Sequence, residues 1–261
     1  MEKYDSAEAF IGVLNAYGVD KIFFNPGGET ALVQATVAKF RTAGKKAPQL
    51  VLCLDESAAV SAAHGHYMVS RQPQVVLVHA ELGTLQLGGN LHNAQWGRIP
   101  IVLMAGYWPD EQRTNWRQQP YDQGGIVRNN VKWDYRVNDT EDIHDVLQKA
   151  FQIACTEPTG PVYLYYPMDF LSKIIVKPVN PPNKPAIPQL PPAKVGDLSQ
   201  AADALIEAKN PLFVVGYSGR YTQNVEALIQ LAETVCAPVL TSQVWMNFPT
   251  DHSLCAGIEQ I

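Results

Sequence analysis

Three short apolar runs between residues 50 and 106 constrain the fold more than any other feature of this sequence. They are residues 50–54 (LVLCL), 75–78 (VVLV) and 100–106 (PIVLMAG), and helix-like segments separate them. None of the runs alternates apolar with polar residues, which is typical of parallel strands buried on both faces of a sheet. Repeated strand–helix–strand units with right-handed crossovers predict an α/β fold, in which helices cover both faces of a parallel sheet.

Neighbouring segments extend this α/β pattern over residues 1–176. Asp5 and Glu8 have the spacing of a capping box at a helix start, and Gly18 has the position of a helix stop. The apolar periodicity predicts helices over residues 5–17, 30–41, 57–71, 85–96 and 140–156, and further strands over residues 21–24 and 161–166.

A proline-rich segment divides the chain. Residues 177–193 contain seven prolines, a composition that favours a stiff, extended linker. Beyond it, residues 194–261 predict helices at 195–209 and 224–234 and strands at 212–216 and 238–241. Two strands leave a sheet with an unpaired edge. We therefore expect the first part of a Rossmann-like α/β domain, which belongs to a longer chain or is completed by another chain.

The composition narrows the class of partners and the compartment. The chain has 261 residues and a net charge of -5, and it has no basic stripe, so nucleic acid is not an expected partner. No apolar segment reaches membrane-spanning length, and the first residues do not resemble a signal peptide. The four cysteines lack metal-ligand spacing, so we expect no metal site on them. They predict buried free thiols in a reducing, cytoplasmic setting.

Two polar residues directly follow predicted strands, where parallel sheets bind ligands. They are Glu56 and His79. A buried Glu56 would favour the protonated carboxyl, which can donate a hydrogen bond to a ring nitrogen of a heterocycle. The alternative is that Asp55 and Glu56 only cap the helix that follows. His79 is either a satisfied structural residue or a proton carrier near neutral pH.

Two glycine-containing segments accompany these residues. Residues 25–29 (NPGGE) lie between a strand and a helix, an arrangement that can bring backbone N–H groups to a ligand or can be a simple turn. Residues 83–89 predict a glycine-rich turn. The long segment 107–131 shows little periodicity and contains Trp108 and Trp116. It is either an interface loop or a surface loop held by its aromatic residues.

In this order, the motifs resemble those of the amino-terminal half of thiamine-diphosphate-dependent enzymes of the pyruvate decarboxylase, acetolactate synthase and benzoylformate decarboxylase group. The resemblance rests on NPGG at 25–28, the strand before Glu56 with its alanine-rich helix, VHAELGT at 78–84, NLHNAQWGRIPIVLMAG at 90–106, and GPVYL at 160–164. It covers essentially the whole chain, and the ordered set is more specific than any one motif.

The resemblance implies roles for individual residues. Glu56 would hydrogen-bond the pyrimidine ring of thiamine diphosphate and so promote loss of the thiazolium proton, and His79 would be an active-site proton carrier. The residues that would line the cofactor are Pro26, Gly27, Gly28, Glu56, Gly83, Thr84 and Asn90. The implied substrate is a 2-oxo acid, and the implied reaction is a decarboxylation or a carboligation of the acetolactate synthase type.

The resemblance also implies a missing half. The family binds Mg²⁺ and the diphosphate through a GDG…N motif in its carboxy-terminal domain, and this sequence has no such motif. We therefore expect a homo- or hetero-oligomer with a second chain that carries the diphosphate-binding domain. The alternative is a non-catalytic remnant that binds a partner through its sheet edge and the 107–131 segment. Gly28, Glu81 and Gln86 depart from the family pattern, Gly28 because some decarboxylases carry a polar side chain there.

Overall fold

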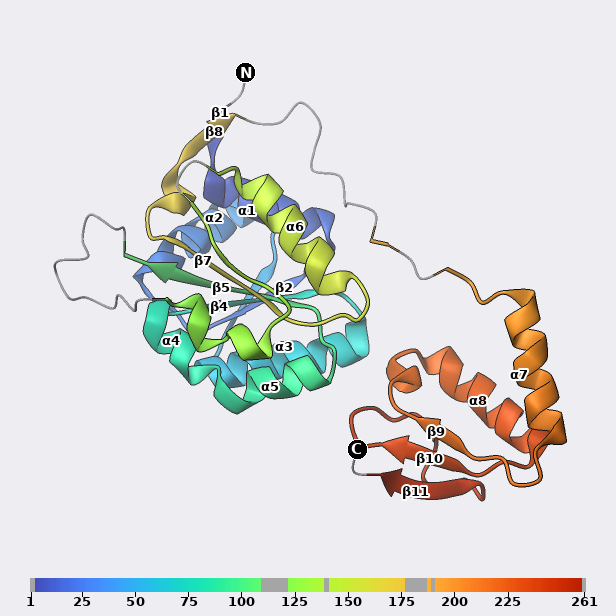
Figure 1. Cartoon of the computed structure of the whole chain (residues 1–261). Helices are drawn as coiled ribbons and strands as arrows, with labels where there is room; N and C mark the ends of the chain where they lie inside the picture. The colour runs from blue at the N-terminus through green and yellow to red at the C-terminus, as the bar shows by residue number, and fades with distance from the viewer. Residues whose placement is uncertain (1–2, 109–121, 139–140, 177–186, 189–190, 260–261) are drawn as a thin grey trace. The chain divides into compact units, whose positions relative to one another are not determined.

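The computed structural model describes residues 3–108, 122–138, 141–176, 187–188 and 191–259 (Figure 1). The chain divides into two compact units, Met1–Gln189 and Leu190–Ile261. Most of the proline-rich segment 177–193 lies outside the described residues, as do residues 109–121 of the long segment with Trp116.

The first unit is built on a six-stranded sheet in the order β3-β2-β4-β5-β7-β6. Every strand pairing in this sheet is parallel, which confirms the predicted fold class. The strands are β2 (Lys21–Phe24), β3 (Gln49–Leu52), β4 (Gln74–Val78), β5 (Ile101–Tyr107), β6 (Asp134–Arg136) and β7 (Val162–Pro167).

Helices cover both faces of the sheet, as predicted. One face carries α1 (Ser6–Ala16), α2 (Ala31–Thr42) and α6 (Ile143–Cys155), and the other carries α3 (Glu56–Ser70), α4 (Ala80–Gln86) and α5 (Gly88–Trp96) (Figure 1). The capping box at the start of α1 is also confirmed. The Glu8 N–H donates to Asp5 Oδ1 at 2.7 Å, and the Asp5 N–H donates to Glu8 Oε2 at 3.3 Å.

The main apolar core lies between the sheet and the α1, α2 and α6 layer. Tyr17 and Phe151 stack there with ring centroids 4.2 Å apart. Every residue of β4 is buried, as the unalternating run 75–78 predicts for a strand with helices on both faces. Burying one large apolar side chain stabilises a fold by roughly 1.5–3 kcal/mol, so this core fixes the positions of the strand ends.

Some predictions about the first unit are wrong. Residues 50–54 are not buried on both faces, because β3 is the edge strand and pairs only with β2; Leu52 is 62% exposed and Leu54 is 95% exposed. The predicted glycine-rich turn at 83–89 is instead helical, because α4 and α5 follow each other with only Leu87 between them. The short strands β6, β1 (Lys3–Asp5) and β8 (Ile174–Val176) have three residues each, which is too short to show a period.

The second unit is a smaller α/β unit. Its parallel sheet has the order β11-β10-β9, with β9 (Phe213–Val215), β10 (Val239–Ser242) and β11 (Cys255–Glu259), and it carries α7 (Val195–Glu207) and α8 (Thr222–Val235). The prediction of two strands is wrong, because β11 adds a third that contains Gly257 and lacks an apolar run.

The cysteines are free but not fully buried: Cys236 is exposed and the others are partly exposed. Across the described ranges, each helix is too short or too polar to cross a bilayer.

Candidate active site

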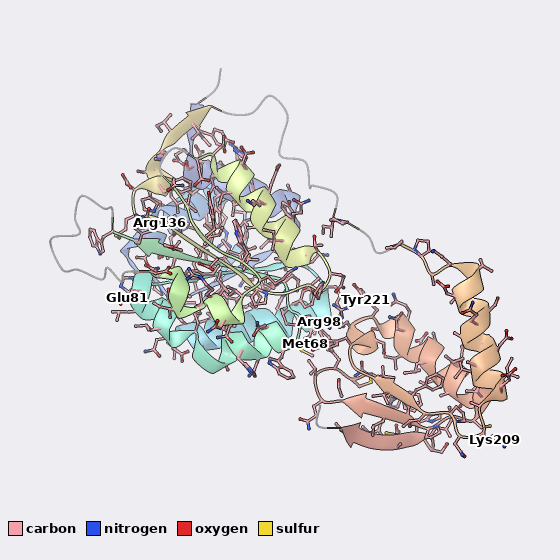
Figure 2. All side chains as sticks on the ribbon, in the orientation of Figure 1. Met68, Glu81, Arg98, Arg136, Lys209 and Tyr221 are labelled. Carbon is pink, nitrogen blue, oxygen red and sulfur yellow. The ribbon has the colours of Figure 1, made fainter. Side chains whose placement is uncertain are left out.

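The strand order creates a switch point between β2 and β4. The chain leaves β2 toward α2 on one face of the sheet and leaves β4 toward α4 on the other face. Open α/β sheets bind ligands beyond the carboxyl ends of strands that diverge in this way. In Figure 2, Glu81 marks the start of α4 beside this switch point, and Met68 marks the far end of α3.

Glu56 is the first residue of α3, but it is not the residue that caps this helix. Asp55 Oδ1 accepts hydrogen bonds from the Ala58 N–H at 2.7 Å and from Ser57 Oγ at 2.6 Å, so Asp55 alone caps the helix. Glu56 is nevertheless buried, with 6% of its surface exposed. The described residues show no hydrogen bond to its carboxylate, and its oxygens are not among the fully enclosed side-chain atoms that lack a partner. A mostly buried carboxylate at the carboxyl edge of the sheet is a candidate ligand-binding group.

Gly83 lies directly against Glu56. A Cβ atom at position 83 would lie 2.6 Å from Glu56 Oε1 and 3.1 Å from its Cδ. Only glycine therefore lets α4 approach the carboxylate this closely. The Gly83 N–H donates to the carbonyl of His79 at 2.6 Å, so one turn of backbone connects His79 with the glycine that contacts Glu56.

His79 precedes α4 and is paired with a residue that the sequence analysis gave no role. His79 Nδ1 lies 3.0 Å and 3.1 Å from the two carboxylate oxygens of Glu29. The Glu29 side chain is fully buried, whereas the His79 side chain is 32% exposed. The backbone of Gly27 packs on both, because a Cβ atom there would lie 2.0 Å from His79 Nδ1. The structure thus brings Gly27, Glu56, His79 and Gly83 into one neighbourhood.

The remaining residues predicted to line the cofactor have different surroundings. Pro26 and Gly28 are exposed in the loop after β2. An added Cβ at Gly28 would meet only Met168 Cε, at 3.7 Å, so a side chain would fit there. Asn90 Nδ2 donates to the carbonyl of Ser57 at 3.0 Å, a bond that ties α5 to the first turn of α3 beside Glu56.

Thr84 faces the protein core. Its hydroxyl donates to the Ala80 carbonyl at 2.6 Å and lies 2.6 Å from the hydroxyl of Tyr163 on β7. Gln123 Nε2 donates to the same Tyr163 oxygen at 2.8 Å and to the carbonyl of Gly106 at 3.1 Å. Burial raises the pKa of Tyr163 well above its usual range. This buried network fixes α4 on the sheet, so the hydroxyl of Thr84 has a structural partner.

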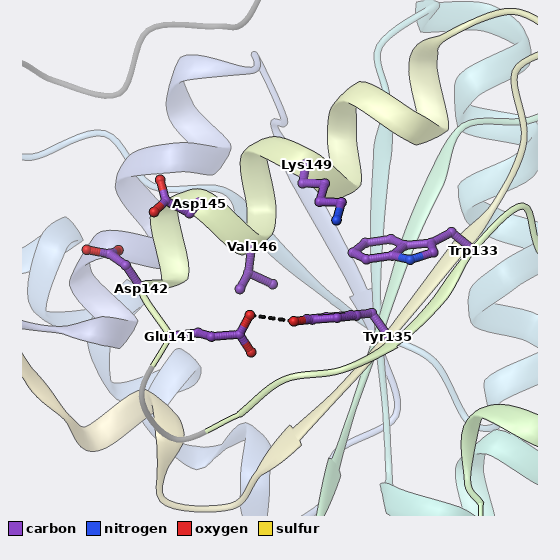
Figure 3. A pocket seen from close by; sticks show the side chains of 7 residues that line it. All are labelled: Trp133, Tyr135, Glu141, Asp142, Asp145, Val146 and Lys149. Carbon is purple, nitrogen blue, oxygen red and sulfur yellow. Dashed lines mark hydrogen bonds between the residues drawn. The ribbon is translucent and has the colours of Figure 1, made fainter.

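A pocket of about 380 Å³ lies elsewhere on the first unit, between β6 and α6 (Figure 3). The Lys149 ammonium lies 5.2 Å from the ring centroid of Trp133, and Tyr135 donates to Glu141 at 2.5 Å. Lys149 and Glu141 thus each interact with an aromatic side chain of the pocket wall. The lining residues are Trp133, Tyr135, Glu141, Asp142, Asp145, Val146 and Lys149.

The residues at the switch point fit one half of thiamine diphosphate. A buried carboxylate that lacks a donor, next to glycines that admit close approach, suits the nitrogen-rich pyrimidine ring. In the described ranges, no group of three His, Cys, Asp or Glu side chains is placed to hold a metal ion.

Comparisons with known proteins agree with this picture. Residues 5–126 match the family model described as "Thiamine pyrophosphate enzyme, N-terminal TPP binding domain". The acetolactate synthase isozyme 3 large subunit of Escherichia coli is 31% identical over 265 residues, which cover 99% of this chain and 45% of that protein. The acetolactate synthase large subunit of Haemophilus influenzae is 29% identical over 262 residues, with 99% of this chain and 45% of that protein covered.

A solved structure has a similar fold. It is that of a Mycobacterium smegmatis protein assigned as a thiamin diphosphate-dependent enzyme, with a TM-score of 0.81 and 27% identity over 98% of this chain and 48% of that one. The chain spans less than half of the length of these relatives. The family model, the relatives and the fold agree: residues 5–126 are similar to the N-terminal domain of thiamine pyrophosphate enzymes.

Proposed function

We propose that this chain supplies the pyrimidine-binding half of the active site of a thiamine-diphosphate-dependent enzyme that acts on a 2-oxo acid. The reaction would be a decarboxylation or a carboligation of the acetolactate synthase type. One observation carries the proposal: in a domain similar to those of this family, Glu56 is 6% exposed, at the sheet switch point, and without a donor in the described part of the chain.

The proposal gives the following roles to the residues of the site. When bound, thiamine diphosphate supplies an electron sink for cleavage of the bond next to the 2-oxo group. Glu56 holds a proton at its carboxyl and bonds a pyrimidine nitrogen, and Gly83 lets it lie against α4. Pro26, Gly27 and Gly28 offer backbone atoms from the loop after β2. His79 moves a proton at its imidazole as a second acid–base group.

The other half of the site would come from a diphosphate-binding domain that also holds Mg²⁺. Two facts support this part of the proposal: the described residues offer no group of three metal ligands, and the chain corresponds to less than half of its relatives. The domain would be on a second chain, in a homo- or hetero-oligomer, and the enzyme would act in the cytoplasm.

The test uses this chain together with a diphosphate-binding half encoded beside it in the genome. With thiamine diphosphate and Mg²⁺, the mixture should consume pyruvate or another 2-oxo acid. Glu56→Gln should lower the rate by at least roughly 100-fold, the size of a typical general acid–base contribution. Glu81→Gln on α4 is the matched control and should keep the rate. A Glu56→Gln variant with full activity would contradict the proposal, and a mixture that binds the cofactor but turns over no 2-oxo acid would favour a non-catalytic partner-binding chain.

A further inference from the structure

We propose that Glu29 is the positioning residue of His79: it holds the imidazole in the tautomer protonated at Nδ1, so that Nε2 is the atom that accepts and returns the proton. The catalytic meaning of this pair rests on the proposed function, whereas the tautomer is a property of the chain itself. Glu29 and His79 are 50 residues apart in the sequence.

The pair spans the switch point of the sheet. Glu29 follows β2 on the path to α2, and His79 follows β4 on the path to α4, so their contact joins the two segments that diverge there. The Asn25 N–H donates to the Leu77 carbonyl at 3.2 Å and keeps the ends of the two strands together. The contact is therefore fixed by the sheet rather than by a flexible surface loop.

Packing leaves the Glu29 carboxylate one orientation. Its side chain is fully buried. An added Cβ at Gly27 would lie 2.4 Å from Glu29 Oε2, and one at Gly106 would lie 2.8 Å from Glu29 Cβ. Gly27, in the loop after β2, and Gly106, on β5, thus flank the Glu29 side chain. Its negative charge acts on its surroundings, because burial and then the charge of Glu29 raise the pKa of Tyr166 above its usual range.

A backbone donor fixes the carboxylate plane. The Ala80 N–H donates to Glu29 Oε1 at 2.7 Å. Ala80 has φ +39°, a left-handed conformation that is unfavourable for a residue with a Cβ atom. This unusual backbone begins α4 directly after His79, and the bond to Glu29 stabilises it. Strained backbone that is held in place by its surroundings is typical of functional sites.

The hydrogen-bonding chemistry then sets the tautomer. A carboxylate only accepts hydrogen bonds, so the nitrogen that faces it must carry the proton. In His79 that nitrogen is Nδ1, at 3.0 Å and 3.1 Å from the carboxylate oxygens. In the neutral ring the lone pair is then on Nε2, which is turned away from Glu29. A carboxylate that orients an imidazole in this way is a recurring feature of histidines that transfer protons or bind metals.

Glu29→Gln tests the assignment without a large change in shape. The Ala80 N–H still needs an acceptor, so the amide oxygen should take the place of Oε1. The amide N–H₂ then takes the place of Oε2, 3.1 Å from His79 Nδ1, and it can only donate. The amide nitrogen cannot accept the Nδ1 proton, which leaves the amide oxygen, 3.0 Å from Nδ1 and already bonded to the Ala80 N–H. The predicted result is a shift of the tautomer population from Nδ1–H toward Nε2–H.

Long-range ¹H–¹⁵N spectra of the ¹⁵N-labelled full chain at alkaline pH distinguish the two tautomers of each histidine, and His79→Gln identifies the His79 signals. The wild-type chain should show His79 protonated mainly at Nδ1, and E29Q should show a larger share protonated at Nε2. A wild-type ring protonated mainly at Nε2, or tautomer shares that E29Q leaves unchanged, would overturn the assignment. If E29Q does not fold, the wild-type spectrum alone decides between the two tautomers.

The chain contains its own control. His144 Nδ1 lies 2.7 Å from Asp142 Oδ1, a second carboxylate–imidazole pair, at the start of α6. Glu29→Gln should leave the His144 signals unchanged, and Asp142→Asn should leave the His79 signals unchanged. The spectra need neither cofactor nor substrate. An inactive enzyme whose His79 has the predicted tautomer would therefore count against the proposed function alone, and an active enzyme with the other tautomer against this inference alone.

Discussion

The carboxylate of Glu56 lies against the α-carbon of Gly83, so closely that a Cβ atom at position 83 would force the carboxylate to shift. The two residues belong to α3 and α4, which follow different strands of the sheet. Gly83 is 27 positions after Glu56 in the sequence. The two residues meet only because the folded sheet brings α3 and α4 together. The contact makes the position of Glu56 sensitive to single-atom changes on α4.

Gly83→Ala should displace Glu56. Alanine in place of glycine usually stabilises a helix interior by about 1 kcal/mol. Here the new Cβ atom would lie 2.6 Å from Glu56 Oε1, and such overpacking costs about 1–3 kcal/mol. We expect lower stability in urea unfolding of the chain. Gly89→Ala on α5 is the control, because a Cβ there meets nothing within 4 Å, and it should be neutral or stabilising. Equal behaviour of the two variants would show that the close contact is absent.

Thr84→Val should destabilise the fold through the buried network. The substitution removes the hydroxyl that bonds Ala80 and Tyr163, and unsatisfied buried polar groups cost about 1–3 kcal/mol. Thr42 makes the same kind of bond, to the Ala38 carbonyl at 3.0 Å, on the exposed side of α2. Thr42→Val should therefore lower the free energy of unfolding much less. Similar losses in the two variants would mean that burial of the Thr84 hydroxyl contributes nothing.

His64 should make the fold less stable in mild acid. Burial lowers the pKa of His64, so the folded chain binds this proton less tightly than the unfolded chain. As pH falls through about 6.5, the unfolded state gains a proton first, and stability decreases until pH reaches the lower value of the folded state. His64→Gln should reduce the slope of unfolding free energy against pH between about pH 7 and pH 5. His92→Gln, at an exposed position on α5, should not; a slope unchanged by His64→Gln would contradict the expectation.

Cys236→Gly should stabilise the second unit. Cys236 ends α8 with φ +53°, where a residue with a Cβ atom is strained and glycine is preferred. We expect a gain of about 1 kcal/mol, measured as a higher midpoint of thermal unfolding for this unit. Cys236→Ala removes the thiol but keeps Cβ, and it should give no such gain. A gain of the same size in both variants would assign the effect to the thiol rather than to the backbone.

The sheet was predictable because its strands are buried. β4 and β5 are covered on both faces, so their sequences contain the unalternating apolar runs 75–78 and 101–105. The prediction failed where burial is one-sided or the strand is short. β3 is an edge strand with exposed leucines, and β11 has no apolar run. The sequence predicts a turn at α4 because glycine has a low intrinsic helix propensity. The glycine at position 83 is nevertheless helical and lies in close contact with Glu56.

The candidate site was predictable only in part. Glu56 and His79 follow strands, so their place at the carboxyl edge of the sheet follows from the periodicity alone. Glu29 could not be assigned, because its partner is 50 residues away and no local pattern marks the pair. The only signal was a carboxylate directly after a glycine turn. Thr84 and Asn90 have hydrogen bonds within the protein that no spacing rule anticipates.

If Glu56 activates the cofactor, it should speed the loss of the thiazolium C2 proton of thiamine diphosphate. The rate at which this proton exchanges for deuterium measures that loss. The chain, assembled with its diphosphate-binding half and Mg²⁺, should accelerate the exchange over that of the free cofactor. Glu56→Gln should slow the exchange by at least roughly 100-fold, while Glu81→Gln should leave it unchanged. An exchange rate in Glu56→Gln equal to that of the wild-type assembly would contradict the account.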